Sequence, residues 1–558
     1  MVISQHGIVA TSQTLASQAG AQVLARGGSA VDAAIAANAA MSVVEPMSCG
    51  IGGDLFVLYW DAKTHNLTGL NASGWAPKGL TLDYLRGKGL TAMPQDGIQS
   101  VTVPGCVNGW EKLHKRFGKL KWHDLFAPAV YYAEKGYPVT EIIHELWRSN
   151  YNKLAADANG RRIFVREGAT PELGEVFRNP ELGSALKAIA TGGAAAFYRG
   201  PIAKAILATS DRLGGTMAAA DLSEFDAEWV DPISTDYRGW KVYELPPNSQ
   251  GVAALEMLNI MARFPLFHHS EQSAEVLHHR IEAQKLAYAD LARYLADPRF
   301  AQVPLAGMLS KDYARERAEL IDPETARCQV DPGKPLPGPG DTIYLSVVDR
   351  EGNIVSLIQS LYLSFGSGVV VDGFGFHLHN RGGLFDFDPQ HPNALAPRKR
   401  PFHTIIPGFM EKDDLHIGFG IMGGLNQAQA HAQFVGNIVD HNLNLQSALE
   451  APRFTKLNFG GCDVMIEKRV PVEIREELTR RGHRLEVLGD FSSWVGGGQA
   501  VMHDSRTKVN YGASSPRKDG AAVPEAPPYF TDPPAPGARR GTTPSKSGDA
   551  KPQSESRR

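Results

Sequence analysis

Hydrophobic and polar positions along the first 60 residues predict two helices followed by a buried strand. Residues 12–25 are rich in Ala, Gln and Leu and end at a Gly pair, residues 27–28, where a helix is expected to stop. Ser29 opens a second, more apolar helix. The glycine-rich residues 49–54 then lead into the strand-like run 55–60.

The pattern changes from helical to strand-like after a proline- and glycine-rich segment. Residues 110–330 predict mostly helices, the clearest over 274–295. Residues 331–341 read DPGKPLPGPGD, which excludes a helix or a central strand and predicts a flexible connection. Residues 342–349 and 354–360 are β-rich and flank a turn, so they predict a hairpin whose first residue is a threonine.

Composition describes a large globular protein that does not bind polyanions. The 558 residues, 43% hydrophobic and 21% charged, allow three or four modest domains or one large interwound one. Lys plus Arg is 57 and Asp plus Glu is 60, so the net charge is 57 − 60 = −3. Nucleic-acid recognition needs clustered positive charge, so we expect no nucleic-acid partner.

Cysteine usage and the N-terminus indicate a cytoplasmic protein. The four cysteines are widely spaced and form no CxxC pair, so we expect neither a disulfide framework nor a zinc site, and no metal or cofactor: Cys49, Cys106, Cys328 and Cys462. The apolar stretch 30–44 is too short to cross a bilayer. The first residues show neither a basic region nor an apolar core of a signal peptide.

A threonine that opens a strand beside a flexible segment can cleave its own chain. The hydroxyl of Thr342 can attack the preceding carbonyl, and hydrolysis of the resulting ester frees a new N-terminus. The α-amine, with an ordinary pKa of about 7.7–8.0, can then act as base for the hydroxyl beside it. Taken alone, this pattern is weak evidence for self-cleavage, because an ordinary strand threonine fits it as well.

Many blocks of the sequence, in order from about residue 5 to 520, strengthen this interpretation. They include GGSAVDAAIAANAAMSVVEPMSCGIGGDLFVLYW at 27–60, LNASGWAP at 70–77, DYRGWKVYELPPNSQG at 236–251, AQKLAYADLARYLADP at 283–298, DTIYLSVVDREGNIV at 341–355, FGSGVV at 365–370, KRPFHTIIP at 399–407, MGGLNQ at 422–427 and APRF at 451–454. Together they resemble the γ-glutamyltransferase (γ-glutamyltranspeptidase) family.

The resemblance implies an α+β fold and a self-cleaving proenzyme. The expected fold is the N-terminal-nucleophile (Ntn) hydrolase fold, a four-layer αββα sandwich. Cleavage between Asp341 and Thr342 would give a large subunit, 1–341, and a small subunit, 342–520, headed by the nucleophile. The Pro-, Ser- and Arg-rich residues 521–558 are expected to be a disordered tail.

Three further catalytic positions follow from the resemblance. Ser360 lies where the family has a second threonine whose hydroxyl supports the nucleophile. Gly423 and Gly424 match the glycine pair whose backbone N–H groups form the oxyanion hole. Without the resemblance, an ordinary strand serine would explain Ser360 equally well, and a turn after a strand would explain the glycine pair better. The same region contains a GxGxxG match, residues 418–423, followed by Asp440, but no second strand is available for a dinucleotide-binding unit.

The residues expected to bind the glutamyl group are largely replaced. The carboxylate-binding arginine aligns with Ser73, the acidic residue for the α-amino group with Leu384, an asparagine with Tyr362, and a serine pair with His403-Thr404. Arg381 stands where the family commonly has a glutamine and presents a fork suited to a carboxylate.

These replacements favour a small acidic amide without an α-amino group as substrate. A buried ammonium without an acidic partner would lose its hydration uncompensated. The resemblance therefore extends to relatives that act on oxamate or glutaryl-type amides, with water as acceptor. The connection 386–397 is too short for the family's lid, so we expect an open site. Two alternatives remain: a γ-glutamyl hydrolase or transferase, and an unprocessed, inert scaffold or binding protein.

Overall fold

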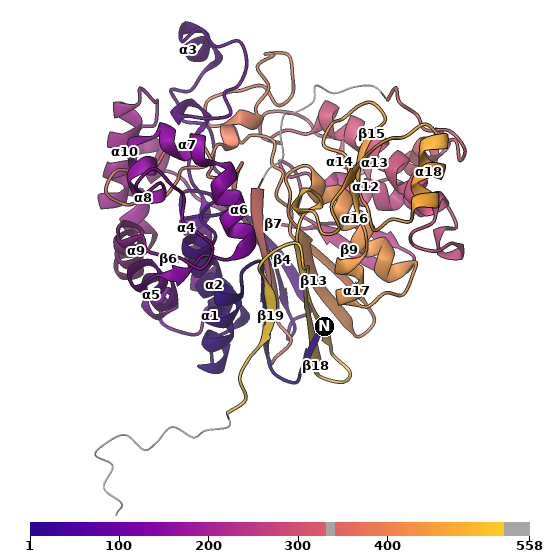
Figure 1. Cartoon of the computed structure of the whole chain (residues 1–558), viewed down its shortest axis with the longest axis horizontal. Helices are drawn as coiled ribbons and strands as arrows, with labels where there is room; N and C mark the ends of the chain where they lie inside the picture. Colours follow the sequence, from indigo (N-terminus) through magenta and orange to yellow (C-terminus); the bar gives the residue numbers. More distant parts are fainter. Residues whose placement is uncertain (331–340, 529–558) are drawn as a thin grey trace, which may run out of the picture.

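The computed structural model describes residues 1–330 and 341–528, with the side chain of residue 341 excluded. Two seven-stranded antiparallel sheets lie face to face between layers of helices (Figure 1). Sheet I has the order β1 Val2–Ser4, β18 Val509–Ser514, β17 Gly498–Asp504, β13 Leu415–Ile421, β12 Gly408–Lys412, β9 Trp240–Glu244 and β8 Ile233–Tyr237. Sheet II has the order β19 Ala521–Pro524, β2 Ile8–Thr11, β10 Asp341–Val348, β11 Ile354–Tyr362, β3 Asp54–Asp61, β4 Asn66–Ala72 and β7 Glu228–Val230.

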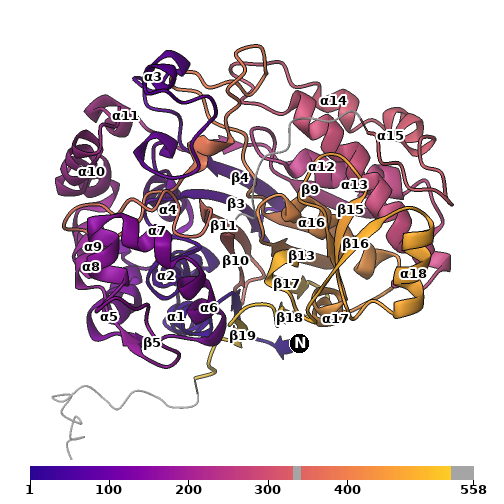
Figure 2. The ribbon, with the colours of Figure 1, turned by 45° about the horizontal axis from the view of Figure 1, so that its top comes forward.

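Helices cover the outer face of each sheet (Figure 2). Those on the side of sheet II are α1 Thr14–Ala25, α2 Ala30–Val44, α4 Cys106–Phe117, α5 Ala127–Lys135, α6 Glu141–Ser149, α7 Tyr151–Ala156, α8 Ala158–Phe164, α9 Pro180–Tyr198 and α10 Pro201–Arg212. Those on the side of sheet I are α12 Gly251–Met261, α13 Ala274–Tyr294, α14 Leu305–Met308, α15 Lys311–Ala318, α16 Asn426–Val439, α17 Leu445–Glu450 and α18 Val472–Arg480. The layer order is therefore αββα, as expected.

Several smaller elements complete the chain. The short helices are α3 Leu82–Gly87 and α11 Ala219–Ser223, and the 3-10 turns are η1 Ile98–Ser100, η2 Trp122–Phe126, η3 Leu266–His268, η4 Arg381–Leu384 and η5 Ser493–Val495. The minor sheets are β14 Phe454–Thr455 with β15 Asp463–Glu467 and β16 Arg484–Leu488, and β5 Tyr137–Pro138 with β6 Val176–Phe177.

The elements expected near the N-terminus are present. Helix α2 is buried along its whole length, which explains why its sequence is apolar on every face. Ser29 caps it: its hydroxyl accepts from Asp32 N, and the Asp32 carboxylate accepts from Ser29 N. The predicted hairpin is β10–β11, and α13 matches the predicted helix 274–295 within one residue.

The core consists of three apolar layers. One joins α2 to the outer face of sheet II, and another joins α12, α13 and α16 to the outer face of sheet I. The third lies between the sheets and includes Phe56, Tyr344, Ile358 and Phe409. Strands β10 and β11 lie between β2 and β3, so residues from both sides of position 341 build one sheet. Strand β11 and residues 342–348 of β10 are buried on both faces, so neither strand alternates between buried and exposed residues.

Two expectations about the chain were wrong. We expected no disulfide, yet Cys328 and Cys462 are joined across 134 residues, because folding brings the segment after α15 against the loop before β15. We expected a disordered tail from residue 521, yet β19 pairs with β2 at the edge of sheet II. Glu525 continues the pairing, since its N–H donates to Gly7 O at 2.8 Å. Residues 529–558 lie outside the described residues.

Within the described residues, no helix is both long and apolar enough to cross a membrane. The cysteine argument for a cytoplasmic location is lost, because the disulfide is of the kind that persists mainly in oxidising compartments.

Candidate active site

The two hydroxyls predicted to act together are neighbours. Thr342 Oγ1 lies 3.1 Å from Ser360 Oγ, and both residues are buried. Ser360 Oγ also accepts from Tyr362 N at 2.7 Å. Ser356 is on the same face of β11 as Ser360, because strand side chains alternate, and its hydroxyl reaches Gly408 O of sheet I at 2.9 Å. The hydroxyl pair therefore lies between the two sheets.

Arg381 is buried beside this pair, not exposed at the surface. Its Nη1 donates to Thr404 Oγ1 at 2.8 Å, and its Cζ lies 4.8 Å from the centre of the Tyr362 ring. Burial lowers the pKa of Arg381 to about 10, so it stays charged near neutral pH. Among the described residues, its Nη2 has no hydrogen-bond partner. A fully buried donor of this kind suits an anionic ligand.

Asp54 is a candidate site residue that the sequence analysis missed. It is fully buried at the start of β3, directly opposite Ser360 in the strand register. Its Oδ2 accepts from His403 Nε2 at 2.8 Å and lies 3.0 Å from His379 Nδ1 and 3.5 Å from Arg381 Nε. The signal was present: an acid that ends CGIGGD and begins an apolar strand must find partners when buried.

The charges in this cluster are set by burial and by one another. Burial opposes the charge of Asp54, but interactions with His379 and His403 outweigh it and hold the pKa of its carboxyl well below the usual range. Burial, with the nearby charge of Arg381, lowers the pKa of His403 to about 3. His403 is therefore neutral near pH 7 and donates its Nε2 proton to Asp54.

The predicted glycine pair forms a sharp turn between β13 and α16. Gly423 and Gly424 have φ values of +117° and +61°, which favour glycine. Gln250 Nε2 donates to Gly424 O at 2.8 Å and also to Thr404 O, so this turn is tied to the loop that holds Arg381. The GxGxxG match does not bind a dinucleotide in a βαβ unit, because α16 is followed by α17 and not by a strand.

The comparison with known proteins decides the family. A family model described as gamma-glutamyltranspeptidase matches residues 16–525. The chain belongs to this family. Its match covers nearly all the described elements, from α1 to β19.

Similar proteins of the gamma-glutamyltranspeptidase family are hydrolases and acylases. The glutathione hydrolase-like YwrD proenzyme of Bacillus subtilis is 37% identical over 527 residues, which are 94% of this chain and 99% of that protein. The oxamate amidohydrolase proenzyme of Klebsiella pneumoniae is 33% identical over 531 residues, 93% of this chain and 99% of that protein. Among solved structures, the cephalosporin acylase from Bacillus halodurans has a TM-score of 0.88 at 43% identity, with 94% of this chain and 96% of that chain covered. This confirms the Ntn-hydrolase fold and an enzyme of this family.

Not every predicted binding residue of this family member points at the site. Ser73 is buried, but its hydroxyl donates to Asn71 Oδ1 at 2.7 Å. Its carbonyl accepts from Arg400 Nε at 2.9 Å, and Arg400 Nη1 donates to Glu228, so both side chains are engaged by other residues. The short connection led us to expect an open site, yet in this uncleaved chain Thr342 is 1% exposed. The connection folds back through Asn393, whose Nδ2 donates to Leu384 O.

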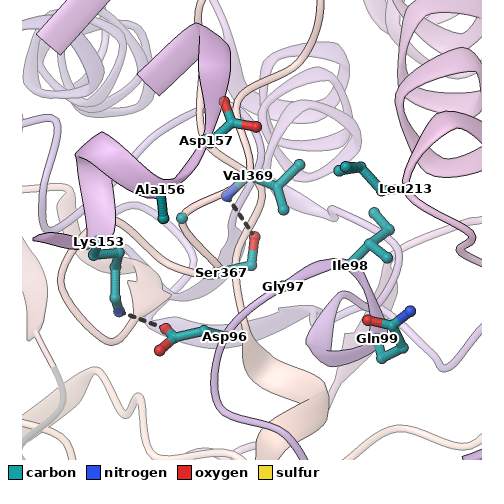
Figure 3. Close-up of a pocket in the computed structure, with 11 residues that line it drawn as sticks. Asp96, Gly97, Ile98, Gln99, Lys153, Ala156, Asp157, Leu213, Ser367 and Val369 are labelled. Carbon is teal, nitrogen blue, oxygen red and sulfur yellow. Dashed lines mark hydrogen bonds and ion pairs between the residues drawn. The ribbon is translucent and has the colours of Figure 1, made fainter. Parts of the chain in front are cut away.

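One cavity, of about 360 Å³, is lined by Asp96 and Lys153 among others, and none of the predicted site residues borders it (Figure 3). A smaller, mostly apolar cavity adjoins the η4 turn, and Leu384, Phe402 and Asp386 are among its lining residues. Leu384 makes this second cavity apolar at the position where the family has an acid.

One group among the described residues could bind a metal by geometry: His278, Glu282 and His483. However, His278 Nδ1 and His483 Nε2 are 2.9 Å apart and hydrogen-bonded, and Lys285 Nζ donates to Glu282 Oε1 at 2.6 Å. The lysine charge opposes a second cation there. An enzyme without metal or cofactor therefore stays our prediction.

The neutral state of His403 predicts acid sensitivity. Its pKa is about 3 in the folded chain and about 6.5 when unfolded, so between these pH values the unfolded chain binds the extra proton. The free energy of unfolding should then fall by up to about 1.4 kcal/mol per pH unit as the pH drops from about 6.5 to 3. Asp54 adds a loss in the same direction only below about pH 4. Urea unfolding of the wild type and of His403→Asn between pH 8 and 4 measures this; equal slopes for the two chains would contradict it.

Proposed function

We propose that the chain is an autoprocessing N-terminal-threonine amidohydrolase that hydrolyses the amide of a small acidic acyl group. The supporting observation is the Thr342–Ser360 hydroxyl pair near the buried guanidinium of Arg381, whose Nη2 has no hydrogen-bond partner among the described residues. The proenzyme relatives agree with the processing step, and the oxamate amidohydrolase and cephalosporin acylase agree with an amide substrate.

The processing step makes the nucleophile. Thr342 Oγ1 attacks the carbonyl carbon of Asp341, the C–N bond breaks, and an ester forms while the nitrogen takes up a proton. Water then hydrolyses the ester, which leaves a carboxylate on Asp341 and an α-amine on Thr342. Ser360 supports the reaction through its hydroxyl, which lies within hydrogen-bond distance of the attacking oxygen.

Substrate turnover repeats the same chemistry on an external amide. The α-amine takes the hydroxyl proton as Thr342 Oγ1 attacks the substrate carbonyl, and the N–H groups of Gly423 and Gly424 stabilise the oxyanion. The leaving amine takes the proton, and water hydrolyses the acyl-enzyme. Arg381 binds the far carboxylate of the acyl group, with Tyr362 and Thr404 holding its guanidinium in place.

A γ-glutamyl hydrolase or transferase is the second candidate. Asp386, two residues after the replaced acid, borders the cavity beside Leu384 and could take an α-amino group. It already accepts from Asp388 N at 2.8 Å and lies 3.7 Å from His391 Nδ1, so it is less available than an unengaged carboxylate would be. The third candidate is an unprocessed, inert scaffold or binding protein. It differs from the two enzyme candidates because its chain would not be cleaved before Thr342.

The processing hypothesis predicts that Thr342→Ala yields an intact, folded and inactive chain, because no hydroxyl is available to attack. Denaturing gels under reducing conditions should show two fragments for the wild type and one for the variant. Sequencing of the smaller wild-type fragment should begin Thr-Ile-Tyr-Leu. Thr342→Ser retains a hydroxyl and should still be cut. Amide hydrolysis by a wild-type chain that remains whole would refute the hypothesis.

The replaced glutamyl-binding residues predict the order of substrates. Glutaryl and oxamyl amides should exceed γ-glutamyl amides in kcat/KM, because a buried ammonium beside Leu384 would be unpaired. An apolar pocket rejects a substrate that adds a neutral hydroxyl by about 10²-fold, and an unpaired charge costs more to bury, so we expect a ratio of at least about 10²-fold. Steady-state hydrolysis of matched p-nitroanilides measures the ratio. A clear preference for the γ-glutamyl compound would promote the second candidate, and Asp386→Asn would then be expected to abolish that preference.

Carboxylate binding by Arg381 predicts a change in KM more than in kcat. Arg381→Ala should raise KM for an acidic amide by about 10–150-fold, since a charged hydrogen bond contributes roughly 1.5–3 kcal/mol. Arg381→Lys should recover only part of the lost affinity, so its KM should lie between those of the wild type and Arg381→Ala, because an ammonium cannot bind a carboxylate through two parallel hydrogen bonds. Circular dichroism and normal processing check that the Arg381→Ala chain still folds, although its Asp54 has lost a cationic neighbour. Arg162→Ala, at an exposed arginine, is the control. An unchanged KM in Arg381→Ala would assign the carboxylate to another residue.

A further inference from the structure

The disulfide connects the two sides of the proposed cleavage site. Cys328 comes before Thr342 and Cys462 after it, so the 134-residue separation spans the bond that is cut. Before cleavage the disulfide closes a loop within one chain. After cleavage the same bond joins two chains, the large subunit through Cys328 and the small subunit through Cys462.

The segment carrying Cys328 is held by both future subunits. From the large subunit, His278 Nε2 lies 2.8 Å from Asp322 O. From the small subunit, Arg481 Nη1 donates to Pro323 O at 3.0 Å, and Gly461 N donates to Cys328 O at 3.1 Å. These contacts keep the two cysteines together independently of the chain between them.

The two sulfur atoms have different surroundings. Cys328 is exposed, whereas Cys462 is fully buried with Lys285 Nζ 3.6 Å from its sulfur. A reductant can therefore reach Cys328 Sγ from solvent. Cys462 would leave as a thiolate beside an ammonium group, which is the favourable direction for exchange because a stabilised thiolate leaves faster.

We propose that the mature enzyme is a disulfide-linked pair of subunits, joined by Cys328 and Cys462. External thiols reduce this disulfide by attacking the sulfur of the exposed Cys328. The proposal rests on the proposed cleavage before Thr342. Reduction by a dithiol is balanced: one thiolate attacks Cys328 Sγ, the S–S bond breaks, and Cys462 departs. The second thiol of the dithiol then closes its own disulfide, which leaves two cysteine thiols on the protein.

Gels of the purified, thiol-blocked protein test the link. Without reductant, the wild type should run as one species with the 60.5 kDa mass of the whole chain. With dithiothreitol it should give two fragments. Cys328→Ser and Cys462→Ser should each give two fragments in both lanes, whereas Cys106→Ala, at a buried cysteine away from the link, should behave as the wild type. Two fragments of the wild type in the lane without reductant would overturn the proposal.

A second measurement separates this result from failure of the cleavage. If the wild type stays whole in both lanes, the proposed function fails. The disulfide link is then tested on a Thr342→Ala chain that carries a protease recognition sequence inserted after Gly340 and is cut there by the site-specific protease. One species without reductant and two with it would support the link. Thiol titration of denatured wild type should also gain two thiols on reduction, and no gain would overturn the proposal.

A linked pair should also refold as one molecule. After unfolding in urea, recovery of activity by the linked enzyme should not depend on protein concentration, because the two chains stay joined. For Cys328→Ser, recovery should fall as the protein is diluted. Equal dependence on dilution for the two proteins would contradict a covalent link.

Discussion

The buried pairing of Asp54 with Arg381 and His403 is the interaction on which the rest of the site depends. Asp54 is opposite Ser360 in sheet II, so its position is fixed by the same strand register that places the second hydroxyl. One carboxylate meets a histidine and an arginine that come from two separate loops. Removing it would leave a buried guanidinium uncompensated, which typically costs about 3–5 kcal/mol. A change at Asp54 would therefore affect both the strand register of sheet II and the proposed carboxylate-binding site around Arg381.

Much of this arrangement could be predicted from local sequence patterns. The hairpin β10–β11 follows from two β-rich runs around a turn, and the caps of α2 follow from Ser29 and Asp32. Family blocks then supplied what periodicity could not: that Thr342 and Ser360 would meet. Their 3.1 Å separation agrees with that prediction, while their catalytic roles remain to be measured.

The errors share one physical cause, which is that contacts between distant segments leave little trace in local sequence. Cys328 and Cys462 looked unrelated because each lies in an irregular loop, and contacts between distant segments, such as Arg481 with Pro323 and Gly461 with Cys328, bring them together. The tail resembled a disordered segment by composition, yet its first four residues found an open edge beside β2. Asp54 was overlooked because one acid after several glycines resembles a turn.

The interleaving of β10 and β11 between β2 and β3 has a consequence for the design of new connectivities. Each strand in this group is bonded to a partner from the other side of the proposed cleavage site, so neither of the two expected pieces contains a complete sheet. Meanwhile β1 and β19 lie at corresponding edges of the sandwich, and Glu525 is bonded to Gly7. Joining residue 1 to residue 528 by a short linker and opening the chain before Thr342 would retain the strand order of both sheets. Such a circular permutant would carry its nucleophile directly after the initiator methionine, so removal of that one residue would replace the self-cleavage.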